Sequence, residues 1–395
     1  MNEPVHDTYP GLDSLRALAA IAVLATHTSF WTGQYSKGLL GAATSRLDIG
    51  VAFFFVLSGF LLSRPFLAAI ANGHRAPSAG RYLWKRALRI LPLYWIIVVI
   101  ALVSLEDNRG FGVGDWIRSL TLTNIYFTGA FPAGLTQMWS LAIEIAFYAL
   151  LPILLGAVAW TICRQGWNPG RIVGAVGLLA VLNIAWLLFV APHRLGAGQW
   201  LPSFLTWFGV GLLFATASIE LRRRPGHRVL GVLIELAHHP ATCWTMALSL
   251  FVVATTPVAG PTLLIPPTYG EAITKNLLYA AIAGLVVIPS IFGPHEGTRY
   301  SNLLGSGGLR HIGMISYSIF SVHLLVIHFI AAWRDIPLFQ GRGWELFLLT
   351  LVVSLIASEL LYRLVEMPLM RFRNARVGSS KTRTAAAPND ATTAN

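Results

Sequence analysis

Long apolar segments alternate with short polar connections along almost the whole chain of 395 residues. Ten of these segments approach the roughly 20 residues that an α-helix needs to span the hydrocarbon core of a membrane. They lie at about 14–31, 47–71, 90–105, 138–159, 172–191, 200–219, 242–257, 273–293, 314–333 and 345–365. The third and the seventh are short, so either could be a tilted or re-entrant piece. The pattern predicts an all-α polytopic membrane protein of about ten transmembrane helices.

A β-barrel is the other fold that satisfies its backbone hydrogen bonds in lipid. Barrel strands alternate apolar and polar residues over about ten positions, whereas these runs are longer and continuous. The composition agrees, with 55% hydrophobic residues, 12% charged residues and a mean hydropathy of +0.62. We therefore expect one membrane domain over residues 1–373. Residues 374–395 are rich in Ala, Thr, Ser and Asn, which predicts a disordered cytoplasmic tail.

The basic residues are unevenly distributed between the two sides of this domain. The formal net charge is +12, and with a cytoplasmic N-terminus 20 of the 29 Lys and Arg residues fall in inner segments and 8 in outer ones. The asymmetry follows the positive-inside rule, so we expect a multi-pass protein of the cell membrane with both termini in the cytoplasm. Nucleic-acid binding would need basic residues gathered on one soluble surface. The sequence contains no such surface, and we expect no nucleic-acid partner.

Two polar side chains, Arg16 and His27, interrupt the first apolar run. Eleven helical steps bring them to within about 20° of the same helix face, about 16 Å apart along the axis. Polar groups inside lipid are costly and usually mark a functional site. Arginine can hold an anion, and imidazole can transfer a proton near neutral pH. The alternatives are a snorkelling arginine near the inner interface and an imidazole satisfied by a neighbouring helix.

Glu144 is the second candidate catalytic residue. It lies about six residues into a helix that enters from the outer side, and His27 lies about four residues from the outer end of its own helix. The two depths agree within about 3 Å, so a His–Glu pair is geometrically possible. The alternative is a structural carboxylate hydrogen-bonded to Ser140, four residues earlier.

Arg86 and Arg89 are three residues apart and therefore share a helix face at the predicted cytoplasmic mouth. Paired arginine donors suit phosphate groups, although basic residues beside a helix end often only anchor topology. The longest outer connection, residues 105–137, is well placed to form a vestibule on the opposite side.

Six motifs occur in order along these helices. They are Gly-Leu-Asp13-Ser-Leu-Arg16 followed by His27, Phe53-Phe54-Phe55-Val-Leu57-Ser58-Gly59-Phe60, Arg86-x-x-Arg89-Ile-Leu-Pro92, Trp139-Ser140-Leu141-Ala-Ile-Glu144, Ile315-Ser316-Tyr317-Ser318 followed by His323, and Tyr362-Arg363-Leu-Val-Glu366-Met-Pro368. Together they resemble the acyltransferase-3 family of integral-membrane O-acyltransferases over about residues 10–373. The resemblance implies transfer of an acyl group, acetyl or another short chain, from cytoplasmic acyl-CoA to a hydroxyl of a sugar, envelope glycan, glycolipid or macrolide.

On this interpretation, acyl-CoA is a co-substrate and no cofactor is bound. Coenzyme A docks on Arg86 and Arg89, with Arg16 lower in the tunnel, and His27, held by Glu144, is the general base. An acyl-histidine intermediate is the alternative mechanism. No metal site is expected, because the histidines lie on different helices without a ligand spacing.

Five further residues are expected to line the pocket: Ser58, Trp139, Ser140, Tyr317 and His323. Each has a structural alternative. Ser58 and Gly59 could let two helices approach closely, Trp139 could belong to the outer aromatic belt, and His323 could be a core imidazole.

Three more polar groups near the predicted helices receive no catalytic role. Glu366 follows the last span and is assigned a structural one, whereas His328 and Glu359 stay unassigned. The rival function is a proton-coupled transporter or flippase that uses Arg16, His27 and Glu144 as a relay. Composition and helix number fit that function equally well.

Overall fold

The computed structural model describes residues 9–371, apart from residues 225, 263–264 and 295. Within these residues the regular structure is helical and no strand is present. Eight helices are long and apolar enough to cross a membrane. The predicted class, an all-α polytopic membrane protein, is therefore confirmed. The tail at 374–395 lies outside the described residues, and the cytoplasmic position of the termini stays a prediction.

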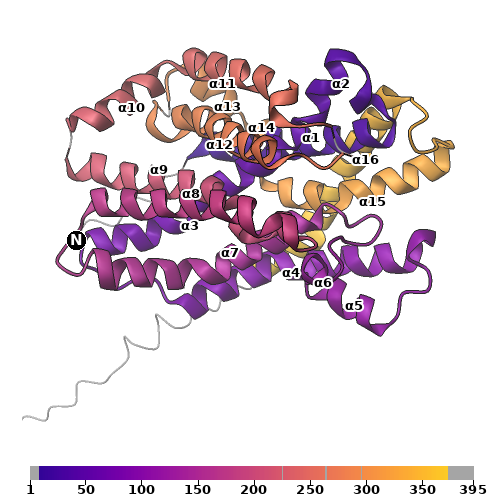
Figure 1. Ribbon diagram of the computed structural model, residues 1–395, viewed down its shortest axis with the longest axis horizontal. Helices are drawn as coiled ribbons and strands as arrows, with labels where there is room; N and C mark the ends of the chain where they lie inside the picture. Colours follow the sequence, from indigo (N-terminus) through magenta and orange to yellow (C-terminus); the bar gives the residue numbers. More distant parts are fainter. Residues whose placement is uncertain (1–8, 225, 263–264, 295, 372–395) are drawn as a thin grey trace, which may run out of the picture.

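Each of the ten predicted apolar runs corresponds to one long helix, and the long helices run roughly parallel (Figure 1). They are α1 (Pro10–Trp31), α3 (Gly50–Ala71), α4 (Ala79–Ser104), α7 (Met138–Ala157), α8 (Pro169–Phe189), α9 (Leu205–Arg223), α11 (Pro240–Ala254), α12 (Tyr269–Phe292), α15 (Ser316–Arg334) and α16 (Gly343–Leu361). Helix α11 has only 15 residues, as its short run predicted. Helix α1 has 22 residues but is not among the eight, since Asp13, Arg16 and His27 lower its hydropathy.

Shorter helices connect these ten. The α-helices are α2 (Gly38–Ser45), α5 (Val113–Leu120), α6 (Asn124–Phe127), α10 (Arg228–His238), α13 (Arg299–Leu304) and α14 (Gly307–Met314). Single turns of 3-10 helix are η1 (Gln34–Ser36), η2 (Leu47–Ile49), η3 (Glu106–Asn108), η5 (Ala191–His193), η6 (Ala197–Gln199), η7 (Leu201–Phe204) and η8 (Pro257–Ala259). Two π-helical turns, η4 (Val158–Ile162) and η9 (Tyr362–Glu366), extend α7 and α16.

Helix α4 is longer than its apolar run. The sequence predicts a short segment at 90–105, but the helix starts at Ala79 and has 26 residues. The Ser78 side chain accepts a hydrogen bond from the backbone N–H of Arg81 and caps the start. The basic residues before position 90 thus form the first turns of the same helix. This extension carries Arg86 and Arg89 on a rigid element that continues into the membrane domain.

Helix α1 lies inside the bundle. It packs against α3, α12, α14, α15 and α16, and the buried side chains Leu15, Val23 and Leu24 lie along it. A Cβ atom on Gly313 of α14 would overlap the carbonyl oxygen of Asp13, so the two backbones approach very closely there. Helix α1, which carries Asp13, Arg16 and His27, is therefore enclosed by its neighbours.

Helices α3 and α9 are held together by two glycines. A Cβ atom on Gly59 would lie 2.3 Å from the carbonyl oxygen of Phe208, and one on Gly211 would lie 2.2 Å from that of Val56. The contact confirms the small-residue packing suggested for Gly59. Next to it, the rings of Phe55 and Phe208 stack with centroids 4.5 Å apart.

We expect Gly59→Val to disrupt this contact, because the backbone of α9 cannot yield as a flexible side chain would. Overpacking of this kind costs about 1–3 kcal/mol or more. The measurement is the thermal midpoint of the detergent-solubilised protein, followed by size-exclusion chromatography. Gly177→Val is the matched control, since a Cβ atom on this α8 glycine would meet nothing within 4 Å. Equal stability of the two variants would contradict the assigned packing.

Candidate active site

Arg16 and His27 of α1 line two different cavities. His27 lines a cavity of about 560 Å³, named here the outer cavity because His27 is near the predicted outer end of α1. Arg16 lines a cavity of about 310 Å³ toward the other end of the helix, the inner cavity. A space of only about 30 Å³, the constriction, is also lined by Arg16. The two groups therefore face protein cavities and not lipid.

The inner cavity gathers the three predicted anion-binding residues, Arg16, Arg86 and Arg89. The Arg86 guanidinium lies 5.9 Å from the centre of the Tyr148 ring. The Nε atoms of Arg16 and Arg86 are buried and have no hydrogen-bond partner within the described part of the chain. Buried donors of this kind are usually satisfied, so the cavity is electrostatically suited to an anionic ligand.

Glu144 belongs to the inner cavity and the constriction. Its Oε1 atom accepts hydrogen bonds from Ser58 Oγ and from the Tyr148 hydroxyl, each at 2.5 Å. The alternative in which Ser140 holds this carboxylate is wrong, because Ser140 Oγ donates to the carbonyl oxygen of Gln137 at 3.3 Å. Helix α7 thus turns Glu144 toward α3 and the arginines.

The expected His27–Glu144 pair is not formed. Glu144 does not line the outer cavity, and His27 lines neither the inner cavity nor the constriction. Phe320 lines both the outer cavity and the constriction, so its ring stands between the two groups. Equal depth along two helices does not determine the direction in which each side chain points. The pairing is therefore corrected, while the separate roles of the two residues stay predictions.

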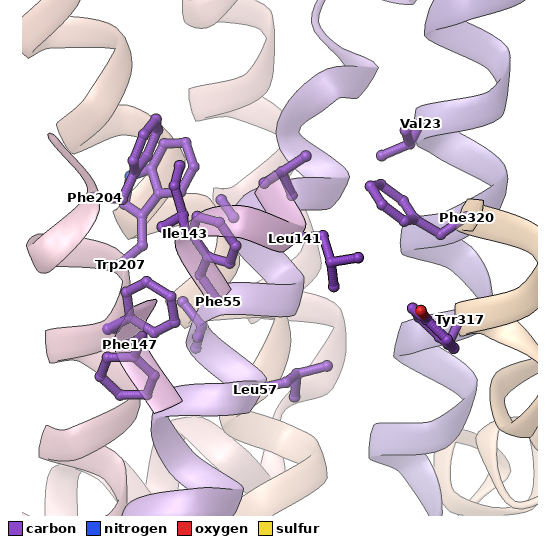
Figure 2. Packing of buried hydrophobic residues seen from close by; sticks show 14 of the residues in the cluster. Val23, Phe55, Leu57, Leu141, Ile143, Phe147, Phe204, Trp207, Tyr317 and Phe320 are labelled. Carbon is purple, nitrogen blue, oxygen red and sulfur yellow. The ribbon is translucent and has the colours of Figure 1, made fainter. Parts of the chain in front are cut away.

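The constriction is aromatic. Phe54 lines the constriction and the inner cavity, and its ring meets Phe320 edge-on with centroids 6.0 Å apart. Tyr317 lies beside Phe320 and faces Leu57 and Leu141 across this region (Figure 2). The Tyr317 hydroxyl donates to the carbonyl oxygen of Ile90 at 2.8 Å, which fixes the ring between α15 and α4. The constriction thus combines aromatic rings with Arg16, Ser140 and Glu144, and it shares lining residues with both cavities.

Four of the five predicted pocket-lining residues line these spaces. Ser58 and Tyr317 line the inner cavity, Ser140 lines the constriction, and Trp139 lines the outer cavity. His323 is the exception, because it is fully buried and lines none of the three. It packs instead directly behind His27, with ring centroids 5.2 Å apart.

The predicted vestibule segment at 105–137 forms part of the outer cavity. Its contributions are Asp107, Ala133, Gly134, Thr136 and Gln137. Trp31 lines the same cavity, and its ring meets that of His328 at 4.8 Å. Asp48 also lines it and is bound by Lys275 Nζ at 2.7 Å and by the Tyr279 hydroxyl at 2.5 Å. The cavity therefore offers carboxylates, imidazoles and flat aromatic surfaces together.

Several residues at the site were not singled out from the sequence, namely Asp48, Phe54, Asp107, Tyr148 and Phe320. Only Tyr148 carried a usable signal, because it lies four residues after Glu144 on the same helix face. The others come from separate elements, so only the fold brings them to the cavities. Within the described part of the chain, no three His, Cys, Asp or Glu side chains lie together as a metal site would need.

Two acidic residues near the C-terminal end have local partners: Glu359, which received no role from the sequence, and Glu366, which was assigned a structural one. Glu359 accepts hydrogen bonds from His311 Nε2 at 2.7 Å and from Arg363 Nε at 2.5 Å. Glu366 is buried and accepts a hydrogen bond from Ser318. Both contacts join α16 or its π-helical extension to neighbouring helices.

The fold and the cavities define a polytopic membrane protein with two cavities along one enclosed helix. A family model described as an acyltransferase domain matches residues 9–363. The chain belongs to this family, and the resemblance inferred from the six motifs is confirmed.

The chain is similar to three curated relatives whose names describe different proteins. Peptidoglycan O-acetyltransferase OatA of Listeria monocytogenes is 26% identical over 92% of this chain and 56% of its own length. Nodulation protein 10 of Rhizobium leguminosarum is 26% identical over 92% of this chain and 94% of its own. Acyltransferase MdmB of Streptomyces mycarofaciens is 26% identical over 93% of each chain. The chain thus spans little more than half of OatA. No solved structure matches it significantly.

We expect Tyr148→Phe to destabilise the protein, because it removes one of the two donors to the Glu144 carboxylate. Hydrogen bonds to charged groups contribute about 1.5–3 kcal/mol. The measurement is the free energy of unfolding in mixed micelles titrated with a denaturing detergent. Tyr126→Phe is the control, because the exposed Tyr126 ring packs on Trp200 and its hydroxyl makes no hydrogen bond to the described residues. Similar losses in both variants would show that the hydrogen bond to Glu144 does not stabilise the site.

Proposed function

We propose that this protein is an acyl-CoA-dependent O-acyltransferase of the cell membrane. It transfers acetyl or another short acyl group to a hydroxyl of a sugar, an envelope glycan, a glycolipid or a macrolide. The observation that supports this most directly is the pair of cavities on α1, one lined by three arginines and the other by His27, with the constriction sharing lining residues with both. OatA, whose name describes acetyl transfer to peptidoglycan, supports a glycan acceptor.

The inner cavity is the donor site. Coenzyme A carries a pyrophosphate and a ribose phosphate, and arginines bind such groups through paired N–H donors. Arg16 and His27 are about 16 Å apart along α1, a separation that suits a donor with a long thin arm ending in the thioester. At about 30 Å³ the constriction is smaller than such an arm, so Phe54 and Phe320 move apart to admit it, and their rings then keep bulk water away from the thioester.

The outer cavity is the acceptor site. Trp31 and Trp139 offer flat apolar surfaces, and the carboxylates of Asp48 and Asp107 accept hydrogen bonds from hydroxyl groups. His27 removes the proton from the acceptor hydroxyl as its oxygen attacks the thioester carbonyl. The carbon–sulfur bond then breaks, and the imidazolium returns the proton to the departing thiolate.

Glu144 acts on the donor side in this scheme. Its carboxylate is held by Ser58 and Tyr148 and lies within electrostatic reach of Arg16. It therefore orients the arginine that lines the constriction, and it does not stabilise the imidazolium. An acyl-histidine intermediate is the alternative mechanism, and a burst of thiol without any acceptor would favour it.

We expect the purified protein to release free thiol from acetyl-CoA when a glycan acceptor is present. His27→Ala should lower this rate by about two to four orders of magnitude, the usual contribution of a positioned general base. His239→Ala is the control, because the His239 side chain is exposed and its ring contacts Glu235, far in sequence from the residues that line the three cavities. If wild type never releases thiol over a range of acyl donors and acceptors, a transporter or flippase becomes the better interpretation. Near-normal turnover by His27→Ala would instead show that His27 is not the general base.

Replacing Arg86 and Arg89 by Ala should raise the KM for acyl-CoA about tenfold or more. The same change should make donor binding less sensitive to salt, because fewer charged contacts remain. Initial rates at varied acyl-CoA and salt concentrations measure both effects. The matched control is Arg81→Ala with Lys85→Ala, which removes two charges from the same turns of α4 at positions that do not line the inner cavity. If both pairs change only expression or orientation, the arginines are topological anchors.

A further inference from the structure

His323 lies behind the proposed base and is otherwise unexplained. It is on α15, fully buried, and its ring centroid is 5.2 Å from that of His27 with an angle of 38° between the ring planes. We propose that His323 is a positioning residue that holds one nitrogen of His27, so that the other nitrogen faces the outer cavity as the base. This inference rests on the proposed function.

The hydrogen bond at Nδ1 shows which ring nitrogen of His323 carries the proton. Its Nδ1 atom lies 3.1 Å from the carbonyl oxygen of Ile319, one turn earlier in α15. A carbonyl oxygen can only accept, so Nδ1 carries the proton and the neutral ring presents a lone pair at Nε2. That Nε2 atom is buried and has no hydrogen-bond partner within the described residues. A buried acceptor without a donor costs free energy. We therefore expect a neighbouring donor group to turn toward this Nε2 atom.

His27 is the polar group that can supply this donor. An N–H···N bond of about 2.9 Å between two imidazoles needs a separation between ring centres of about 5.2 Å, which is the separation found. The χ2 angle of histidine is broad, and in the proposed contact the His27 ring turns about it to bring an N–H group to the Nε2 atom of His323. The second nitrogen of His27 is then unprotonated and faces the outer cavity.

The other titratable groups that face the outer cavity do not take this role. They are Asp48, which is bound by Lys275 and Tyr279, Asp107 on η3, and His328, which packs on Trp31. None of them makes a hydrogen bond to His27 in the described part of the chain. The nearby amide of Gln137 already donates to the carbonyl oxygen of Ser321 at 3.1 Å.

During the reaction only His27 changes its protonation state. His27 takes the proton of the acceptor hydroxyl and becomes an imidazolium, whose other N–H group donates more strongly to His323 Nε2. His323 keeps its own proton on Nδ1, bound to the carbonyl oxygen of Ile319. When His27 returns its proton to the thiolate, both rings are neutral again. His323 therefore does for His27 what a carboxylate does in many catalytic triads.

Two amide substitutions separate this role from simple packing. His323→Gln places an amide oxygen near the position of Nε2 and so keeps an acceptor for His27. His323→Asn places its amide near Nδ1, where it can still donate to Ile319, but it offers nothing at the position of Nε2. We expect Asn to lower kcat for thiol release about tenfold or more with little change in the KM for acyl-CoA, and Gln to retain most of the wild-type kcat.

A second readout does not depend on acyl transfer. Diethyl pyrocarbonate modifies an unprotonated imidazole nitrogen, and peptide mass spectrometry gives the rate at His27. We expect wild type and His323→Gln to be modified at similar rates and His323→Asn at least about twofold more slowly, since its His27 ring is no longer held. Thermal midpoints of all three proteins report on folding.

The outcomes are distinguishable. Equal losses of kcat in the two variants, a loss confined to KM, or equal modification rates in all three proteins would overturn the positioning role. If wild type shows no thiol release but the modification rates differ as expected, the proposed function fails while the His27–His323 contact stands. In a His27→Ala background, His323→Asn should cost little further activity, because the two residues act as one unit.

Discussion

The arrangement of the helices depends on the free-energy cost of placing polar side chains at membrane depth. Arg16 and His27 occupy one helix, and neither can face lipid without a large penalty. Helix α1 is therefore enclosed by α3, α12, α14, α15 and α16. The glycine at position 313 lets α14 approach the start of α1 until their backbones touch. The more apolar helices, such as α8 and α16, are left mostly exposed on the outside.

Enclosing one helix creates two separate environments along it. The arginine end is open to a small cavity rich in positive charge, and the histidine end is open to a larger one that also contains carboxylates and tryptophans. Phe54 and Phe320 close the space between them. A group-transfer enzyme benefits from such a division, because two dissimilar substrates can enter from opposite sides while the reacting atoms meet away from water.

The helices and part of the inner cavity could be predicted from residue spacing. All ten apolar runs are helical, because a backbone in lipid must satisfy its own hydrogen bonds whatever its neighbours are. The three-residue spacing of Arg86 and Arg89 on one helix brings both to the inner cavity, and Gly59 marks the closest approach of α3 and α9. These are local properties of single helices or of small residues.

The partners of the proposed catalytic groups were decided only by tertiary structure. Helical period and depth placed Glu144 level with His27, yet the rotation of α7 about its axis turns the carboxylate to Ser58 and Tyr148. His323 could be recognised as an intramembrane imidazole, but not as the ring behind His27. The sequence by itself determined which residues are helical and which polar groups must be enclosed, since both follow from the energetics of each segment in lipid. How each helix is rotated against its neighbours depends on packing between segments far apart in the chain, and that rotation assigns every polar group its partner.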